Sequence, residues 1–162
     1  FGCLVGSEMC IRDRNNILNR LFSRRVKGVE TIALNTDANH LNQCKAHVRK
    51  VLGAKVTKGR GAGGDPYIGK RCAEDDDEDI RGKLSDGDII FVIAGMGGGT
   101  GTGSAPVIAK YAKETDAVVV GVAILPFREE GLSRRKVALE GLAELKKNCD
   151  CVIELDLSLI HI

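Results

Sequence analysis

The residues best suited to chemistry in this chain are the glycines and threonines of segment 95–103, which reads GMGGGTGTG. Six of its nine residues are glycine, the residue that loses most backbone freedom on folding. In return, glycine reaches positive φ and has no Cβ, so successive backbone N–H groups can turn toward one anion. We therefore interpret the segment as a binding loop for a phosphate group rather than as a flexible linker.

The elements on either side of this segment support that interpretation. An apolar run at 89–94 precedes it and predicts a buried strand. A helix is predicted to open at Ser104, with Ser104 as its N-cap and Pro106 near the first helical position. The N–H groups and the positive dipole end of this helix would then face the glycines. A strand, a glycine loop and a helix N-terminus together form a phosphate-binding arrangement.

Two common glycine motifs do not fit segment 95–103. No Lys follows the glycines, which excludes a Walker-type P-loop, and the spacing differs from that of the dinucleotide fingerprint. Thr100 and Thr102 instead place hydroxyl donors where a P-loop uses an ammonium group. This chemistry suits a polyphosphate that is held by neutral donors together with a bound cation.

Composition excludes several other classes of protein. The 162 residues carry a net charge of +2 and only 4% aromatic residues, so a nucleic-acid partner is not expected. No apolar run approaches the ~20 residues of a membrane span, and the first residues lack a signal-peptide core, which predicts a cytoplasmic protein without direct membrane insertion. The six scattered cysteines are expected to be free thiols, and no metal site is predicted. The acidic run 74–79 is interpreted as a solvated helix N-terminus rather than a metal site.

The remaining pattern predicts an α/β fold. Strands are expected at 3–5, 30–34, 48–52, 89–94, 117–125 and 151–155, and helices from Asn15, near Ile80 and Leu84, from Ser104 and over 133–148. This alternation implies a parallel sheet with helices on both faces. Ligands bind such sheets beyond the carboxyl ends of the strands. The segments 35–38, 59–66, 95–103 and 126–131 all follow strands, so we expect them to meet on one rim.

With the motif GGGTGTG after an apolar strand, followed by Ser-Ala-Pro-Val-Ile-Ala at 104–109, the chain resembles the tubulin/FtsZ superfamily, with an archaeal FtsZ character. Three further segments match nucleotide loops of that family in the same order: NTDA at 35–38, GAGGDP at 61–66 and PFREEG at 126–131. The resemblance implies a Rossmann-like GTPase domain. It also implies GTP or GDP as ligand, with Mg²⁺ accompanying the nucleotide.

The resemblance assigns roles to individual residues. It implies that the phosphates are held by Gly98, Gly99, Thr100, Gly101, Thr102 and Gly103. Ala62 and Gly63 would approach the γ-phosphate, whereas Glu130 and Arg134 would contact the ribose side. Asn16 matches the asparagine that ends the first glycine loop of the family. A solvated surface charge is the alternative interpretation of Glu130.

The chain departs from the family at both ends. Where the family has its first glycine loop, residues 7–14 read SEMCIRDR, with no glycine and two acids, so phosphate would be repelled there. Both ends look like translated sequencing-adapter sequence around a gene fragment. We therefore expect residues 1–14 and 157–162 to be foreign and residues 15–156 to be an incomplete GTP-binding domain without the family's second domain.

The function that the resemblance implies is that of a GTPase that polymerises head to tail into cell-division filaments. It would act in the cytoplasm at the division site, with itself and division-site proteins as partners. In the family, the second domain of a neighbouring subunit completes the catalytic site, so no catalytic residue is identified here and the chain alone is expected to be inactive. A related cytoskeletal or regulatory nucleotide-binding protein is the alternative, followed by a dinucleotide-binding oxidoreductase.

Overall fold

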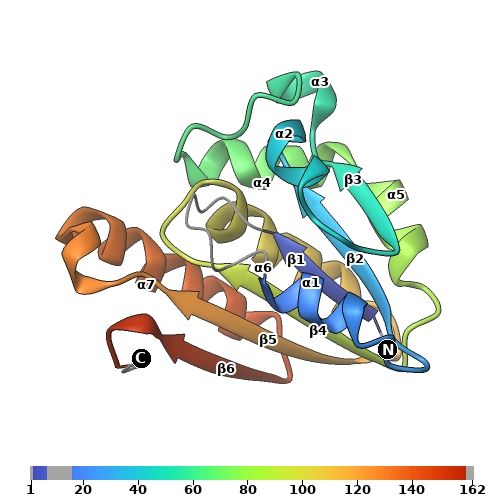
Figure 1. Ribbon diagram of the computed structural model, residues 1–162. Helices are drawn as coiled ribbons and strands as arrows, with labels where there is room; N and C mark the ends of the chain where they lie inside the picture. The colour runs from blue at the N-terminus through green and yellow to red at the C-terminus, as the bar shows by residue number, and fades with distance from the viewer. Residues whose placement is uncertain (1, 7–15, 160–162) are drawn as a thin grey trace.

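The computed structural model describes residues 2–6 and 16–159, which form one parallel sheet with helices on both faces (Figure 1). The strands are β1 (Gly2–Gly6), β2 (Glu30–Asn35), β3 (Val48–Val51), β4 (Ile89–Gly95), β5 (Val118–Leu125) and β6 (Cys151–Asp156). The α-helices are α1 (Asn16–Ser23), α2 (Ala38–Asn42), α3 (Ala54–Thr57), α4 (Pro66–Asp75), α5 (Asp77–Leu84), α6 (Thr100–Lys113) and α7 (Leu132–Lys147). Two 3₁₀ turns complete the fold, η1 (Arg128–Glu130) and η2 (Leu157–Leu159).

The six strands lie in the order β3-β2-β1-β4-β5-β6 and all pair in parallel. β1 lies in the centre, where Leu4 is in register with Ile32 on one side and Val92 on the other. The strand order reverses direction between β1 and β4, and in open α/β sheets ligands bind beyond the carboxyl ends of the strands at such a point. The predicted fold class is confirmed.

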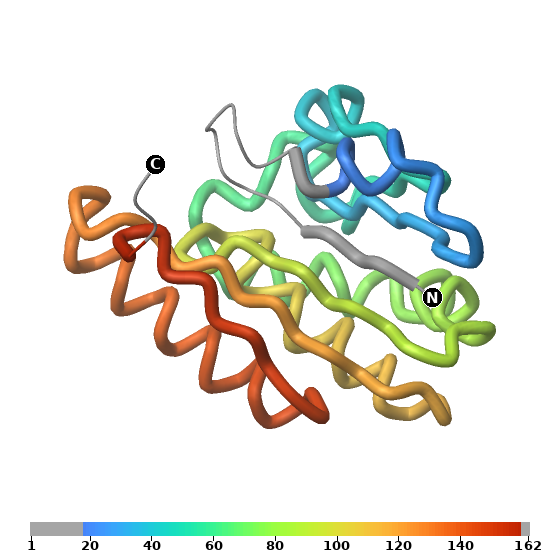
Figure 2. The backbone as a smooth tube through the Cα atoms, turned by 60° about the horizontal axis from the view of Figure 1, so that its bottom comes forward, coloured from blue at the N-terminus to red at the C-terminus, as the bar shows by residue number. Residues whose placement is uncertain are grey.

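Alternate residues of the strands face two separate cores. In β2, Ile32 and Leu34 are buried with residues of α4, α5, α6 and α7, whereas Ala33 between them is buried with Leu18 of α1 and Leu41 of α2. α1 and α2 therefore cover one face of the sheet and α4 to α7 the other, as the two views show (Figures 1 and 2). This layering holds the carboxyl ends of the strands at one edge of the domain.

The predicted strands agree with the observed ones to within two residues, but α6 starts earlier than predicted and the helices α2, α3 and α4 were not predicted. α6 begins at Thr100, not at Ser104, so the prediction of Ser104 as N-cap is wrong. Pro106 lies inside α6 rather than at its start. α4 was not predicted, although Asp65 caps it by accepting from Tyr67 N at 2.9 Å and Pro66 opens it.

Candidate functional site

The segments after β2, β3, β4 and β5 meet at the carboxyl edge of the sheet, as the sequence predicts. The centre of this edge is residues 96–99, the short connection between β4 and α6. Met96 in this connection is fully buried, and its N–H donates to the carbonyl of Ile124 in β5 at 2.8 Å. The connection is therefore attached to the sheet and does not behave as a linker.

The first turn of α6 braces this connection. Gly97 has φ of 101°, a backbone conformation that residues other than glycine rarely adopt. Its N–H donates to Oγ1 of Thr102 at 2.8 Å. The Gly103 N–H donates to the Gly99 carbonyl at 3.0 Å and is thus used within the helix. The N–H groups of Gly101 and Thr102 precede this first helical bond and belong to the positive end of the helix.

Ser104 and Pro106 have roles other than the predicted ones. The Ser104 hydroxyl donates to the Thr100 carbonyl, one turn earlier, at 2.6 Å, and the residue is fully buried. Pro106 has no N–H and so cannot donate to the carbonyl of Thr102. Because α6 starts four residues earlier than predicted, Thr100 to Gly103 are helical, and the loop itself is short.

The second glycine segment packs directly on the first. A Cβ at Gly99 would lie 2.8 Å from the Asp65 nitrogen and 2.9 Å from the Ala62 Cβ. A Cβ at Gly103 would overlap the carbonyl oxygen of Pro66, where α4 crosses α6. Gly99 and Gly103 are therefore required for close packing of backbone against backbone. This contact places Ala62, which is 1% exposed, beside the glycine loop.

The segment after β2 joins the same rim through two hydrogen bonds. The hydroxyls of Thr36 and Thr100 lie 2.5 Å apart, and both side chains are fully buried. The carbonyl of Thr36 accepts the Gly61 N–H at 3.1 Å. Thr36 was not predicted as a site residue. Its position directly after a buried strand is the sequence signal that could have identified it.

Glu130 and Arg134 face each other across the start of α7. The Nε atom of Arg134 lies 3.2 Å from Oε2 of Glu130, and the Glu130 side chain is only 16% exposed, so it is not a solvated surface charge. Arg134 also covers Gly97, because a Cβ there would lie 2.9 Å from its Cγ. The predicted ribose-side pair therefore lies next to the glycine loop.

An ion pair fixes the start of α7 against the end of β6. Nη2 of Arg135 lies 3.0 Å from Oδ2 of Asp156, and this guanidinium holds the pKa of the Asp156 carboxyl below its usual value. The Ser158 hydroxyl also accepts the Arg128 N–H at 3.1 Å. These contacts attach the segment that carries Glu130 and Arg134 to the end of β6, and no local sequence pattern predicts them.

Two predicted features at the rim fall partly or wholly outside the described residues. Asn16 opens α1, but its side chain is not among those that the structure describes. Residues 7–14, predicted to be foreign, lie outside the described part of the chain. Within that part, no group of three or more His, Cys, Asp or Glu could hold a metal ion.

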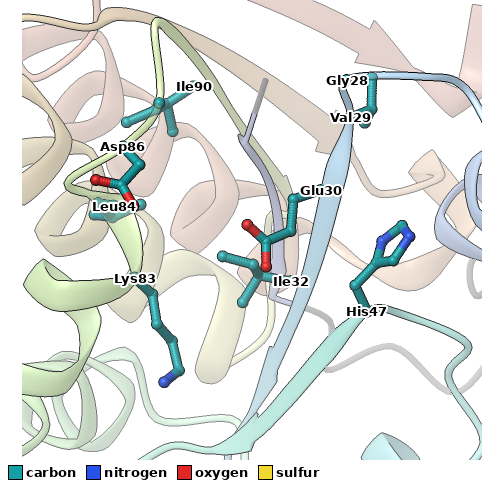
Figure 3. Close-up of a pocket in the computed structure, with 10 residues that line it drawn as sticks. Gly28, Val29, Glu30, Ile32, His47, Lys83, Leu84, Asp86 and Ile90 are labelled. Carbon is teal, nitrogen blue, oxygen red and sulfur yellow. The ribbon is translucent and has the colours of Figure 1, made fainter.

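One hollow lies away from this rim, and a second borders the first turn of α6, where Thr102 and Gly103 line it. One has a volume of about 420 Å³ at the amino edge of the sheet and is lined by Glu30, His47, Lys83 and Asp86 among others (Figure 3). The other has a volume of about 700 Å³ between α4, α6 and α7. Neither is lined by Glu130, Arg134 or residues 96–99. In the described part of the chain, no helix is both long and apolar enough to cross a membrane.

Proteins of known family are similar to this chain over most of its length. Residues 1–160 match the model of the Tubulin/FtsZ family, GTPase domain. Cell division protein FtsZ 2 of Methanocaldococcus jannaschii is 49% identical over 142 residues, which are 88% of this chain and 37% of that protein. Cell division protein FtsZ of Methanothermobacter thermautotrophicus is 49% identical over 139 residues, 86% of this chain and 36% of that protein. The chain thus spans little more than a third of these relatives.

Solved structures agree with the sequence relatives. The FtsZ dimer of M. jannaschii superposes with a TM-score of 0.89 at 40% identity, covering 97% of this chain and 45% of that one. The GDP-bound monomer of CetZ1 from Haloferax volcanii superposes with a TM-score of 0.83 at 26% identity, covering 97% and 51%. Sequence and fold agree with the glycine motif, and the chain belongs to the tubulin/FtsZ family, whose GTPase domain it matches.

Proposed function

We propose that this chain is the GTP-binding part of an FtsZ-type GTPase that polymerises into filaments for cell division. The observation that carries the proposal is that the segments after β2, β3 and β5 all pack on the β4–α6 connection and the first turn of α6. Thr36 contacts Thr100, Ala62 contacts Gly99, and Arg134 contacts Gly97. A linker or a purely structural glycine run does not need such convergence on a helix N-terminus.

Within this proposal, each predicted residue has a specific task. The N–H groups at the start of α6 would hold the phosphates, with Gly98 and Gly101 as the positions where phosphate approaches the backbone most closely. Ala62 and Gly63 would meet the γ-phosphate from the neighbouring loop. Glu130 would accept hydrogen bonds from the ribose hydroxyls, and Arg134 would balance its charge. Asn16 would contact the nucleotide from α1.

Mg²⁺ fits this site only when phosphate oxygens of the nucleotide supply most of its ligands. The described residues supply hydroxyl and N–H donors at the rim but no cluster of carboxylates that could hold the ion by itself. A magnesium ion prefers oxygen ligands and commonly binds phosphate oxygens with only one or two protein groups. When bound, it would neutralise phosphate charge next to the neutral donors of α6.

Hydrolysis and polymerisation would depend on more chain than is present here. The solved relatives include an FtsZ dimer and a CetZ2 protofilament, which supports self-association as the route to assembly. The catalytic groups would come from the second domain of a neighbouring subunit. We therefore propose that this chain binds nucleotide without turning it over, and that the full-length protein works in the cytoplasm with division-site proteins.

A cytoskeletal role outside division is the second candidate function. It is favoured by the CetZ structures, which match this fold at 26–30% identity with TM-scores of 0.80–0.83. The FtsZ relatives are closer in sequence, at 45–49% identity. A fluorescently tagged full-length protein that failed to gather at the division plane would favour the second role.

Calorimetric titration with GTP and Mg²⁺ tests the nucleotide site. We expect weak binding to the chain as it stands, because residues 9–14 carry Asp13 and have no glycine that would let phosphate approach the backbone. Replacing residues 9–14 by Gly-Cys-Gly-Gly-Ala-Gly should raise the affinity at least tenfold. Adding Gly101→Leu to that version should then lower it by about tenfold, since one or two charge-assisted hydrogen bonds are lost.

Three outcomes would contradict the proposal. These are equal affinities of the chain and the replaced version, no effect of Gly101→Leu in a folded protein, and preferential binding of ATP or NAD in parallel titrations. Circular dichroism of each variant is the control for folding. Steady phosphate release by the isolated chain would contradict the proposal that catalysis needs a second domain.

A further inference from the structure

Charge is distributed unevenly along this chain. Residues 16–64 contain ten Lys and Arg against two Asp and Glu, a net charge of +8. Residues 65–159 contain twelve Lys and Arg against eighteen Asp and Glu, a net charge of −6. The total of +2 therefore conceals two regions of opposite sign.

The basic region includes a patch on the face of the sheet that α1 and α2 cover. This basic patch consists of six exposed residues: Arg20, Arg24, Arg25, Lys27, Lys45 and Arg49. Two contacts bring its parts together, since the Lys45 N–H donates to the Asn19 side chain at 2.7 Å and the Phe22 and His47 rings lie 5.0 Å apart. Arg49 points to the α2 side, where it reaches the Asn42 carbonyl at 3.5 Å.

The acidic region includes a patch on the opposite face. This acidic patch consists of three exposed residues at the junction of α4 and α5: Glu74, Asp75 and Glu78. Its neighbours Asp76 and Asp79 pair with Nζ of Lys50 at 3.2 and 2.7 Å. These ion pairs attach the α4–α5 junction to β3, which is an edge strand of the sheet. α1 and α5 lie on opposite sides of the sheet, as Figure 2 shows.

We propose that these two patches bind each other between copies, so that the basic patch of one molecule docks on the acidic patch of the next. Because the patches lie on opposite faces of the sheet, copies that share one orientation and stack face to face can bring a basic patch against an acidic patch. Such a contact is heterologous and can continue from copy to copy. None of the residues in the two patches is a predicted nucleotide contact, so the contact requires no nucleotide.

A second copy fits these observations better than other anionic partners do. Duplex DNA or an anionic membrane would be attracted by the basic patch but repelled by the acidic region of the same small domain. The acidic patch of a second copy supplies the complementary charge at equal concentration. The attraction must depend strongly on salt, because the Debye length falls from about 30 Å at 0.01 M to about 10 Å at 0.1 M.

Sedimentation velocity without nucleotide tests this proposal. At 10 mM NaCl, the weight-average sedimentation coefficient of the chain should rise with protein concentration, and at 300 mM NaCl it should not. The double variants Arg20→Glu/Arg24→Glu and Asp75→Lys/Glu78→Lys should each lower the association constant at least tenfold. The exposed pair Lys110→Glu/Lys136→Glu has the same charge change as the first variant and should leave association within twofold.

Mixing the two patch variants gives the decisive measurement. The first has acidic side chains on both faces and the second has basic ones, so each alone should stay monomeric while an equimolar mixture associates. A mixture that stays monomeric would overturn the proposal. So would an acidic-patch variant that associates as the original chain does, or a basic patch that binds anionic vesicles or DNA while self-association is absent. GTP titration of the same variants should be unchanged, which separates this proposal from the nucleotide site.

Discussion

Glycine-rich segments follow both β3 and β4, and their glycines differ in backbone conformation and surroundings. In the segment after β3, positive φ values occur at Gly59, Gly61, Gly63 and Gly64, between 61° and 87°. In residues 95–103, Gly97 has positive φ, whereas Gly99 and Gly103 are needed because neighbouring backbone leaves no room for a Cβ. The first segment uses glycine mainly for conformation and the second mainly for close packing.

This difference predicts how the two segments respond to the same small change. A methyl group added at a packed glycine must push two elements apart, and overpacking of this kind costs about 1–3 kcal/mol or more. A methyl group added at an exposed glycine with positive φ costs only the local backbone strain, about 1–2 kcal/mol. Glycine-to-alanine variants therefore separate the two uses of glycine by their effect on the free energy of unfolding.

The largest effect is expected for Gly103→Ala. Its Cβ would overlap the Pro66 carbonyl and lie 2.7 Å from the Lys70 nitrogen, so α4 and α6 must separate. We expect a loss of about 3 kcal/mol, which corresponds to a decrease of about 6–12 °C in Tm for a domain of this size. Thermal unfolding by circular dichroism measures it. A decrease below 2 °C would show that the helices are not in close contact.

Gly97→Ala is expected to follow, at about 2–3 kcal/mol. The substitution combines positive φ with a Cβ that would lie 2.9 Å from Cγ and 3.1 Å from the carbonyl oxygen of Arg134. Because Arg134 must move, this variant should also weaken GTP binding in the version with the replaced 9–14 segment. Chemical denaturation and calorimetry test the two effects. Unchanged GTP affinity would separate Arg134 from the nucleotide site.

Thr102→Val tests the hydrogen bond that supports the conformation of Gly97. Valine keeps the shape of threonine but leaves the Gly97 N–H without its acceptor, at a cost of about 1–3 kcal/mol. Thr102→Ser is the matched control, since it keeps the hydroxyl and removes the methyl group that contacts Gly141. Urea denaturation should rank serine above valine in stability. The reverse order would mean that packing on α7 matters more than the hydrogen bond.

The prediction of these two segments from sequence succeeded where the pattern was local and failed where it depended on packing. Alternating apolar runs identified the strands, and parallel topology then required the loops after them to share one edge. The start of α6 was misplaced because Ser104 and Pro106 carry typical helix-start signals, while Gly101 and Gly103 are poor helix formers. Contact with α4 overrides those preferences, and α4 itself was missed. Arg135 and Asp156 are 21 residues apart in the sequence, so their ion pair has no local signature.

The smallest effect is expected for Gly63→Ala in the segment after β3. Gly63 has φ of 61°, and a Cβ there would meet no heavy atom within 4 Å in the part of the chain that the structure describes. Strain of about 1–2 kcal/mol is partly offset by the lower entropy of the unfolded chain, about 0.4–1 kcal/mol, so the net loss should be about 1 kcal/mol.

Gly82→Ala is the matched control for Gly63→Ala. Gly82 lies in α5 with equally open surroundings, and there alanine should stabilise the fold by up to about 1 kcal/mol through helix propensity. If Gly63→Ala lowers the free energy of unfolding and Gly82→Ala raises it, the positive φ at position 63, and not a lack of space, is what requires glycine there. If Gly63 also approaches the γ-phosphate, its variant should bind GTP more weakly while binding GDP as before. Equal losses for both nucleotides would place Gly63 away from the γ-phosphate and restrict its role to the turn.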